Sequence, residues 1–522
     1  MATVNIPLQV TPKRSPDWAA FPSRFVSVAP YLLIGLLFFA QLGHRDLYSS
    51  HEARAAQNAQ RMLDTGEWGL LVLFDGRADL QKPPAYYWAV AALGRLNGGV
   101  VTEWVARFPS ALAGLVCVLL VYASLRADRR PKAATIAAIG LATANHFTGI
   151  SRTARIDVPL ACAVFVSLMA FYRGCLAMGH SRLPGTIPAT PQAATTPLAW
   201  HLLSAVAAGI AVLLKGPVAL ALIGPVAVVW LLIERRHSAV RLPVISALLG
   251  PVVVAVVALP WFLWINDHTD GEFLRVFFWH HTIARYTGSS PLLASHPWWY
   301  YIPRFAVDFL PWTPALAGLG LWAFRSGYWR SDSMFRFGFI STSVMFAVLS
   351  TAKFKRADYL LPLFPFAALV LGSVAEAWLA SRSLTRTVRN AEWAFVGTVA
   401  VMCVAWVAMA TVIEPAEQAR EEKRRFAEMI RSHAPAPNVI LQFRMESHLL
   451  SYHLGQPVHT FVEWGELNDL LAAPGPHFVI MPPEYVYSAG EICTSRKLVV
   501  LGHLEEYTTG KPARPLVFLR TE

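Results

Sequence analysis

Residues 46–88 read DLYSSHEARAAQNAQRMLDTGEWGLLVLFDGRADLQKPPAYYW, and they follow the first apolar segment of membrane-spanning length, at 25–43. The first part predicts a helix over 51–63. Ser50 serves as its N-cap, Glu52 lies in its first turn, and an apolar side contains Ala53, Ala56 and Met62. Such an amphipathic helix is expected to lie on the membrane surface rather than to cross the bilayer.

The second part of this stretch places a lysine on a fixed bend. Lys82 stands in QKPPAYYW, where two prolines prevent a helix from continuing and an aromatic cluster follows. Acids, bases and aromatic side chains therefore gather directly after a membrane segment. Residues 44–105 are expected to form an external loop that carries the chemistry of the protein.

The composition indicates a polytopic α-helical membrane protein. The chain has 522 residues, of which 55% are hydrophobic, and repeated apolar runs of membrane-spanning length. The net charge of +12 comes largely from short basic loops between these runs, as the positive-inside rule requires. This placement argues against a nucleic-acid partner. Four of the five cysteines lie within apolar runs, so neither a disulfide framework nor a cysteine metal site is predicted.

The basic segment RADRRPK at 126–132 decides the topology. It lies inside only if residues 86–96 form an interfacial or re-entrant helix and residues 108–125 cross the membrane. About eleven spans follow, with the N-terminus cytoplasmic and the C-terminus outside. They are predicted at 25–43, 108–125, 133–150, 157–178, 199–214, 217–234, 243–265, 302–324, 335–351, 357–380 and 392–413. Residues 179–198 are expected to form a flexible cytoplasmic connector.

Two domains are predicted, a membrane domain over 1–413 and a small external α/β domain over 414–522. The second begins with a charged helix candidate at 414–433. Short strands are predicted at 438–443, 477–481, 497–504 and 514–520. This domain shows no recognisable active site.

With this topology, the ionisable groups of separate segments converge on the outer face. They are Glu52, Lys82, Arg155, Asp157, Lys215, the loop 267–301, Lys353, Lys355 and Arg356. Ionisable residues at such positions commonly mark a substrate site, although lysines and arginines also snorkel from helix ends. Asp157 has a second interpretation as the N-cap of the span that it begins.

The second external loop, 266–301, combines His280, His281, Arg285 and His296 with many aromatic residues. Histidines can bind zinc, but adjacent histidines on a helix point in different directions, which disfavours a metal site. Arg285 is the preferred phosphate ligand because a guanidinium matches phosphoryl oxygens in bidentate fashion. The run 298–301, WWYY, is also typical of an interfacial aromatic belt.

Several of these segments, in this order, resemble motifs of the polyprenyl-phosphate-sugar-dependent glycosyltransferases, the aminoarabinose-lipid A transferase and protein O-mannosyltransferase group with the GT-C fold. The matching segments are His51-Glu52, Lys82-Pro83-Pro84, 106–110 (ARFPS), 154–157 (ARID), 215–217 (KGP), 296–301 (HPWWYY), 310–312 (LPW) and 350–365 (STAKFKRADYLLPLFP). The chain departs from the family at His51, where an aspartate is usual. The role of the catalytic carboxylate passes to Glu52.

The resemblance implies transfer of a sugar from a polyprenyl-phosphate donor to a hydroxyl of a lipid, glycan or protein on the outer face of the cell (inner, plasma) membrane. It implies inversion at the anomeric carbon and no cofactor or metal. Glu52, Asp157 and His51 are the predicted catalytic residues. The predicted phosphate and substrate ligands are Lys82, Arg155, Lys215, Arg285, His281, His296, Lys355 and Arg356. A lipid-linked-sugar flippase and a non-catalytic membrane scaffold are the alternatives.

Overall fold

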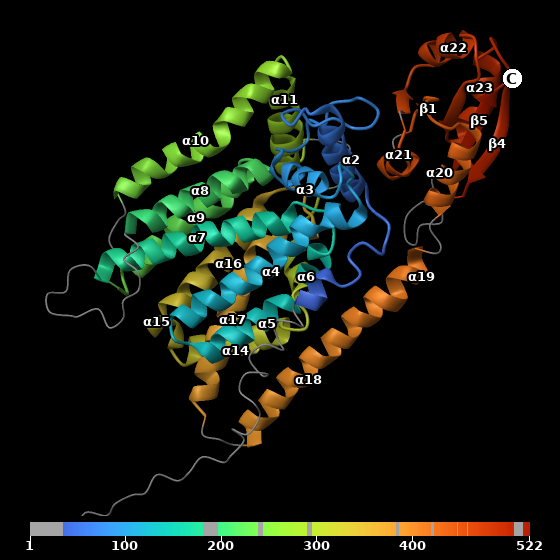
Figure 1. Ribbon diagram of the computed structural model, residues 1–522. Helices are drawn as coiled ribbons and strands as arrows, with labels where there is room; N and C mark the ends of the chain where they lie inside the picture. The colour runs from blue at the N-terminus through green and yellow to red at the C-terminus, as the bar shows by residue number, and fades with distance from the viewer. Residues whose placement is uncertain are drawn as a thin grey trace, which may run out of the picture.

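The protein is seen here as a computed structural model that describes residues 35–180, 197–238, 244–289, 295–382, 386–418, 422–445, 447–456, 458–505 and 515–522 (Figure 1). Most of the first predicted span and most of the predicted connector at 179–198 lie outside these residues. A bundle of apolar helices forms the larger part, and a small sheet domain stands at the C-terminus.

Two short helices lie in residues 44–105, the segment predicted to be the first external loop, and that name is kept for it below. α2 covers Ser50–Thr65, and Ser49, not the predicted Ser50, is its N-cap, because extended Ser49 accepts a hydrogen bond from the Glu52 N–H. Gly66, with φ of 75°, ends the helix in the left-handed conformation. α3, Ala85–Leu96, starts directly after the two prolines. Its 12 residues are too few to cross a bilayer, which fits the predicted interfacial helix.

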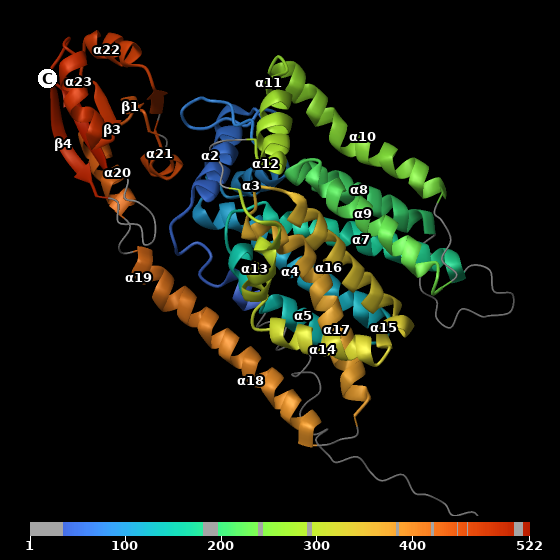
Figure 2. The ribbon, with the colours of Figure 1, turned by 180° about the vertical axis from the view of Figure 1, so that it is seen from behind.

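In the described residues, seven helices are long and apolar enough to cross a membrane. They include α4 (Glu103–Ala127), α7 (Asp157–His180), α8 (Pro197–Lys215), α10 (Val244–His268), α16 (Ser333–Thr351), η3 with α17 (Ala357–Leu363 and Phe364–Ala380), and α18 with η4 (Arg386–Ala408 and Met409–Ile413). α9, Val218–Glu234, is a shorter apolar helix. The total of eleven spans stays a prediction. In both ribbon views, α18 runs along the outside of the bundle toward the sheet domain (Figures 1 and 2).

Two predicted spans are each divided in two. Residues 133–150 form α5 (Pro131–Ala142) and α6 (Asn145–Ser151), while 302–324 form α13 (Tyr301–Asp308) and α14 (Thr313–Arg325). Pro311 cannot continue α13, because it lacks an N–H and its ring clashes with the preceding turn. Two hydrogen bonds join the two breaks. The Asn145 N–H donates to the Leu310 carbonyl at 2.9 Å, and the Trp312 indole donates to Thr143 Oγ1 at 2.9 Å.

The end of the bundle that carries the predicted inner loops is joined by ion pairs. Arg130, from the basic segment, pairs with Asp332 and Glu376, both at 2.7 Å. Arg336 and Glu234 form a buried pair at 2.7 Å. The basic loops between α4 and α5, after α9, before α16 and after α17 therefore meet at one end, as the alternation of spans predicts.

Residues 266–301, predicted to be the second external loop, and their surroundings contain short helices. They are α11 (Glu272–Leu274), η1 (Arg275–Ile283), α12 (Ala284–Thr287), η2 (Trp298–Tyr300) and, beyond α14, α15 (Tyr328–Ser331). Residues 290–294 of this loop lie outside the described residues.

The C-terminal domain is a five-stranded mixed sheet with helices. It contains α20 (Glu422–His433), β1 (Ile440–Phe443), α21 (His448–Leu454), β2 (Val458–Phe461), α22 (Trp464–Ala472), β3 (Phe478–Met481), η5 (Pro483–Tyr485), α23 (Val486–Ile492), β4 (Leu498–Leu504) and β5 (Leu516–Thr521). The strand order is β2-β1-β3-β5-β4, with β1 parallel to β2 and β3. The four predicted strands are present, while β2 was missed. The preceding helix continues past residue 413 as α19, Glu414–Gln418.

This domain docks on the first external loop. Gln57 of α2 donates to the His448 carbonyl at 2.7 Å, and Arg424 of α20 pairs with Asp46 at 2.8 Å. Tyr452 of α21 reaches the Val101 carbonyl at 3.4 Å. The C-terminal domain therefore contacts the helix that carries His51 and Glu52.

Candidate functional site

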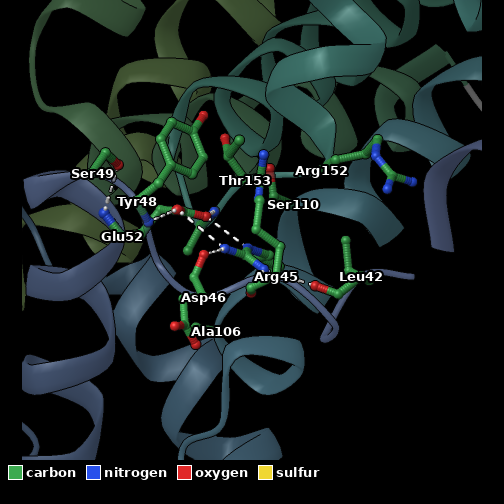
Figure 3. Close-up of polar contacts among 12 residues, drawn as sticks. Leu42, Arg45, Asp46, Tyr48, Ser49, Glu52, Ala106, Ser110, Arg152 and Thr153 are labelled. Carbon is green, nitrogen blue, oxygen red and sulfur yellow. Dashed lines mark hydrogen bonds and ion pairs between the residues drawn. The ribbon is translucent and has the colours of Figure 1, made fainter. Parts of the chain in front are cut away.

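Glu52 is fully buried, and its carboxylate accepts hydrogen bonds from several parts of the chain, drawn in Figure 3. Arg107 Nε donates to Glu52 Oε1 at 2.8 Å, and the same oxygen accepts the Ala154 N–H at 3.0 Å. Glu52 Oε2 accepts the Tyr48 N–H at 3.1 Å. The terminal N–H groups of Arg107 donate to the carbonyls of Leu42, Arg45 and Asp46, and one of them also donates to Glu52 Oε2 at 3.3 Å.

These contacts tie α2, α4, the turn before α2 and the segment before α7 together, and we call them the Glu52–Arg107 lock. Burial alone would raise the pKa of Glu52, but Arg107 and the Ala154 N–H hold it below its usual value. A carboxylate with both oxygens occupied and no exposure is poorly placed to receive a proton from a substrate. The contacts of Glu52 therefore favour a positioning role over the base role predicted from the sequence.

The neighbouring residue His51 faces a different place, a small pocket of about 10 Å³. The pocket is also lined by Lys82, Arg155, Asp157 and the aromatic residues Tyr86 and Tyr87. Its volume is near that of one water molecule. Four of the predicted site residues, from three separate segments of the chain, thus meet in one place, and we call it the Asp157 pocket.

Asp157 stands at the start of α7 and is held by two cations. Lys215, at the end of α8, donates to Asp157 Oδ1 at 2.5 Å. Arg155 Nε lies 3.3 Å from Asp157 Oδ2, and its terminal N–H donates to Asp358 at 2.6 Å. Arg356 Nε lies 3.5 Å from the same Asp358 oxygen. These contacts add Lys215, Arg356 and Asp358 to the pocket, and they exceed what a helix N-cap requires.

The charges of this cluster do not balance. The cations Lys82, Arg155, Lys215 and Arg356 face the carboxylates Asp157 and Asp358, so a fully charged cluster carries two excess positive charges. Desolvation, helped by Lys215 and Arg54 and opposed by Asp157, lowers the pKa of Lys82 to about 7. Desolvation, Lys82 and Arg155 lower the pKa of His51 to about 2, which leaves the imidazole neutral at pH 7. An anion that entered the pocket would balance the excess positive charge and raise the pKa of both Lys82 and His51.

Four predicted ligands lie in a second group around the external loop. Backbone hydrogen bonds join Arg285 and Tyr286 to residues 353–354, and the Arg285 guanidinium lies 5.5 Å from the Phe354 ring centroid. The Lys355 ammonium donates to the Ala352 and His296 carbonyls, which occupies it structurally. The ring of His296 packs on Tyr300, with centroids 4.4 Å apart. Desolvation, and then Arg285, lowers the pKa of His281 to about 4. Within the residues that the structure describes, no hydrogen bond or ion pair joins this group to Asp157.

Sequence reasoning missed Asp358, His146 and Asp308. Asp358 stands two residues after Arg356, in a segment of which only the basic residues were predicted to lie at the site. His146 and Asp308 lie beside the two breaks that divide α5 from α6 and α13 from α14. Both segments were predicted as continuous spans, so neither residue was expected in a site. Among the residues that the structure describes, no cluster of three or more histidine, cysteine or acidic side chains is arranged to hold a metal ion.

A larger cleft of about 820 Å³ lies between α2 and the C-terminal domain. Its lining includes Arg61 and Asp64 of α2, Glu103 of α4, and Arg431 and His453 of the domain. On α2, Gln60 is nine residues from His51, which places it on the opposite side of the helix. The cleft is thus separate from the Asp157 pocket and contains none of the predicted site residues.

A bundle of apolar helices with a charged pocket beside its first external loop, followed by a C-terminal sheet domain, defines the class of GT-C membrane glycosyltransferase folds. The chain matches the family of dolichyl-phosphate-mannose-protein mannosyltransferases (PMT) over residues 36–310. It belongs to this family.

The chain is also similar to curated undecaprenyl phosphate-alpha-4-amino-4-deoxy-L-arabinose arabinosyl transferases. It is 28% identical to one from Pseudomonas fluorescens over 73% of this chain and 63% of that protein. It is 30% identical to one from Pseudomonas aeruginosa over 65% and 58%, respectively. The chain thus spans about three fifths of the length of these relatives.

Two solved structures share the fold. The crystal structure of ArnT from Cupriavidus metallidurans bound to undecaprenyl phosphate aligns with a TM-score of 0.75 at 19% identity, over 95% of this chain and 98% of that chain. The archaeal oligosaccharyltransferase AglB from Archaeoglobus fulgidus, in complex with an inhibitory peptide and a dolichol-phosphate, aligns with a TM-score of 0.57 at 12% identity, over 91% and 71%. The predicted family and the predicted GT-C fold are confirmed.

Proposed function

We propose that this protein is a membrane glycosyltransferase that moves a sugar from a polyprenyl-phosphate donor to a hydroxyl of a lipid, glycan or protein. The observation that carries the proposal is the Asp157 pocket, where four cations meet two carboxylates beside the first external loop. Family membership supports the donor class. The names of the curated relatives make undecaprenyl-phosphate-4-amino-4-deoxy-L-arabinose the first donor to test.

The excess charge suits the change that the donor undergoes. A polyprenyl-phosphate-linked sugar is a phosphodiester with one negative charge, whereas the polyprenyl phosphate that leaves is a monoester with up to two. Cations that already stand around the leaving oxygen stabilise the charge as it develops. Lys82, Arg155 and Lys215 are the ligands proposed for the phosphate in this pocket, with Arg285 and His281 placed toward the second external loop.

In the reaction that we propose, the acceptor oxygen attacks the anomeric carbon while the bond from that carbon to the phosphate oxygen breaks. The phosphate takes the bonding electrons, and the acceptor proton passes to the Asp157 carboxylate. A single displacement of this kind inverts the anomeric centre. Glu52 holds the segment before Asp157 through the Ala154 N–H, and neutral His51 forms the adjacent wall of the pocket.

Turnover by the purified full-length chain in lipid nanodiscs tests this function. The donor named above is supplied with a membrane extract as the acceptor source, and release of undecaprenyl phosphate is followed by mass spectrometry. Wild-type protein should release the lipid phosphate, and Lys82→Met should release far less. Absence of release by the wild-type protein would refute the proposal, whether or not the protein binds undecaprenyl phosphate.

We further propose that the Asp157 pocket and the C-terminal domain lie outside the plasma membrane, with the ion-paired end around Arg130 in the cytoplasm. In a background without native cysteines, exposed Lys132 and exposed Glu67 form a matched pair for labelling. An impermeant thiol reagent added to intact cells should modify Glu67→Cys and spare Lys132→Cys. The reverse pattern would overturn the orientation.

A further inference from the structure

A row of alternating charges leads away from Asp157, first through Arg155, a proposed phosphate ligand, and then through three residues that the proposed reaction does not use. Arg155 joins Asp157 to Asp358, and His146 Nε2 lies 3.3 Å from the other Asp358 oxygen. On its far side, His146 Nδ1 lies 4.0 Å from Asp308. Asp358 and Asp308 are buried, with 5% and 2% of their surface exposed. The row draws on the segment before α7, η3, α6 and α13.

Arg155 makes a closer contact with Asp358 than with Asp157. Its bond to Asp358 is short, at 2.6 Å, whereas its approach to Asp157 is 3.3 Å. Asp157 Oδ2 therefore lacks the close, two-pronged contact that an arginine makes with a carboxylate when nothing competes. Asp157 Oδ1 is already taken by Lys215 at 2.5 Å. Oδ2 is the oxygen that remains for a substrate hydroxyl.

We propose that Asp358, with His146 beside it, is a positioning residue that draws Arg155 away from Asp157 and so leaves one Asp157 oxygen without a close hydrogen bond, able to accept the acceptor proton. The inference rests on the proposed function, because it assigns the acceptor proton to Asp157. It assigns Asp358 no contact with the reacting atoms.

Loss of the Asp358 charge should lower turnover and, at the same time, strengthen the binding of phosphate. Arg155 loses its stronger partner and closes on Asp157, whose Oδ2 then accepts two guanidinium N–H groups and becomes a weaker base. At the same time, the pocket loses a negative charge near the phosphate site, which favours a bound anion. Asp358 therefore supports turnover while it weakens the binding of phosphate. A residue that served only to maintain the fold would support both.

The test compares Asp358→Asn with wild type in two measurements on the full-length protein in nanodiscs. The dissociation constant for undecaprenyl phosphate, which requires no knowledge of the sugar or the acceptor, is expected to stay equal or to fall severalfold. Turnover with the donor named above is expected to fall about tenfold to a hundredfold, the range associated with misplaced reacting groups. His146→Gln, which leaves Asp358 in place, should lower turnover by a smaller factor with unchanged undecaprenyl-phosphate affinity.

Asp128→Asn is the matched control, since Asp128 pairs with Arg173 at 2.5 Å far from the pocket and should leave both measurements unchanged. Weaker undecaprenyl-phosphate binding by folded Asp358→Asn, or turnover equal to wild type, overturns the positioning role. If wild-type protein binds undecaprenyl phosphate but turns over no donor, the proposed function fails, and the binding measurement still decides whether Asp358 opposes the anion.

Discussion

His51 and Glu52 are adjacent in the chain, yet they belong to two regions with opposite properties. In the Glu52–Arg107 lock, a carboxylate and a guanidinium are buried together, and each is satisfied by the other and by backbone groups. In the Asp157 pocket, cations outnumber carboxylates and desolvation lowers the pKa of both Lys82 and His51. Successive residues of a helix point about 100° apart, so one helix start serves both regions.

Charge balance, rather than burial, separates the structural charges of the lock from the functional charges of the pocket. Both regions contain buried charged side chains, so burial does not distinguish them. What differs is the balance of charge. The Glu52–Arg107 lock is neutral and its charged groups are already paired, so a ligand would gain no stabilisation there. The pocket contains charges that an anion would satisfy, and this residual imbalance is typical of a binding site. Variants of the two regions should therefore fail in different measurements.

The largest effect is expected from Asp157→Asn, which keeps the shape of the pocket and removes the proposed base. Turnover should fall about a hundredfold to ten-thousandfold, the usual cost of losing a general base. Undecaprenyl-phosphate affinity should not fall, because the pocket gains positive charge. Turnover is measured by release of undecaprenyl phosphate, and affinity by titration in nanodiscs.

His51→Ala is the discriminating companion to this variant. A neutral wall residue should cost only a severalfold loss of turnover. If His51→Ala abolishes turnover while Asp157→Asn stays near wild type, the imidazole has taken the role of base and the assignment of Asp157 is wrong.

The sequence predicted the ingredients of the pocket better than their contacts. Lys82, Arg155, Asp157 and Lys215 were expected together because the alternation of spans places them at one face. Glu52 was expected there as well, since the sequence contains no sign that Arg107, 55 positions away, would bind it. Side-chain direction on α2 depends on where the helix packs.

The fold shows the same limit. Periodicity and composition identified most helices, the short α3 and four of the five strands. They did not reveal the breaks in the helices at 133–150 and 302–324. Pro311 is a sequence signal for the second break, whereas the first is joined to it by a hydrogen bond between Asn145 and Leu310 that forms only in the folded protein. His146 and Asp308 were missed for this reason. β2 was missed because VHTF is short and half polar.

Glu52→Gln should have the next largest effect, on stability. It leaves the buried Arg107 without its counter-charge, a change that typically costs about 3–5 kcal/mol. Glu234→Gln is the matched control, because it breaks the equally buried pair with Arg336 at the opposite end of the bundle. Both variants should melt at lower temperature in nanodiscs. Only Glu52→Gln should also lower the turnover of the protein that remains folded, since only the lock holds the segment before Asp157. Equal turnover in the two variants would show that the lock contributes to stability but not to catalysis.

A smaller effect is expected from pH. With its pKa near 7, Lys82 is largely neutral above that pH in the empty pocket, and a bound phosphate raises its pKa. Binding above pH 7 therefore takes up a proton, and undecaprenyl-phosphate affinity should fall with rising pH by up to about tenfold per unit. In Lys82→Arg the guanidinium stays charged, so the affinity should be nearly constant between pH 7 and 9. The same slope in both proteins would show that another group titrates.

The smallest effect is expected where the C-terminal domain touches the lock. The backbone carbonyl of Asp46 accepts a hydrogen bond from Arg107 at 2.7 Å, while its side chain pairs with Arg424, a residue whose side chain is 53% exposed. Asp46→Asn keeps the carbonyl and removes only the half-exposed ion pair, which is worth roughly 0.2–1 kcal/mol. Melting temperature and turnover should both stay close to wild type. If turnover instead falls as far as in Glu52→Gln without a loss of stability, the C-terminal domain controls the lock through Asp46 and contributes to catalysis at a distance.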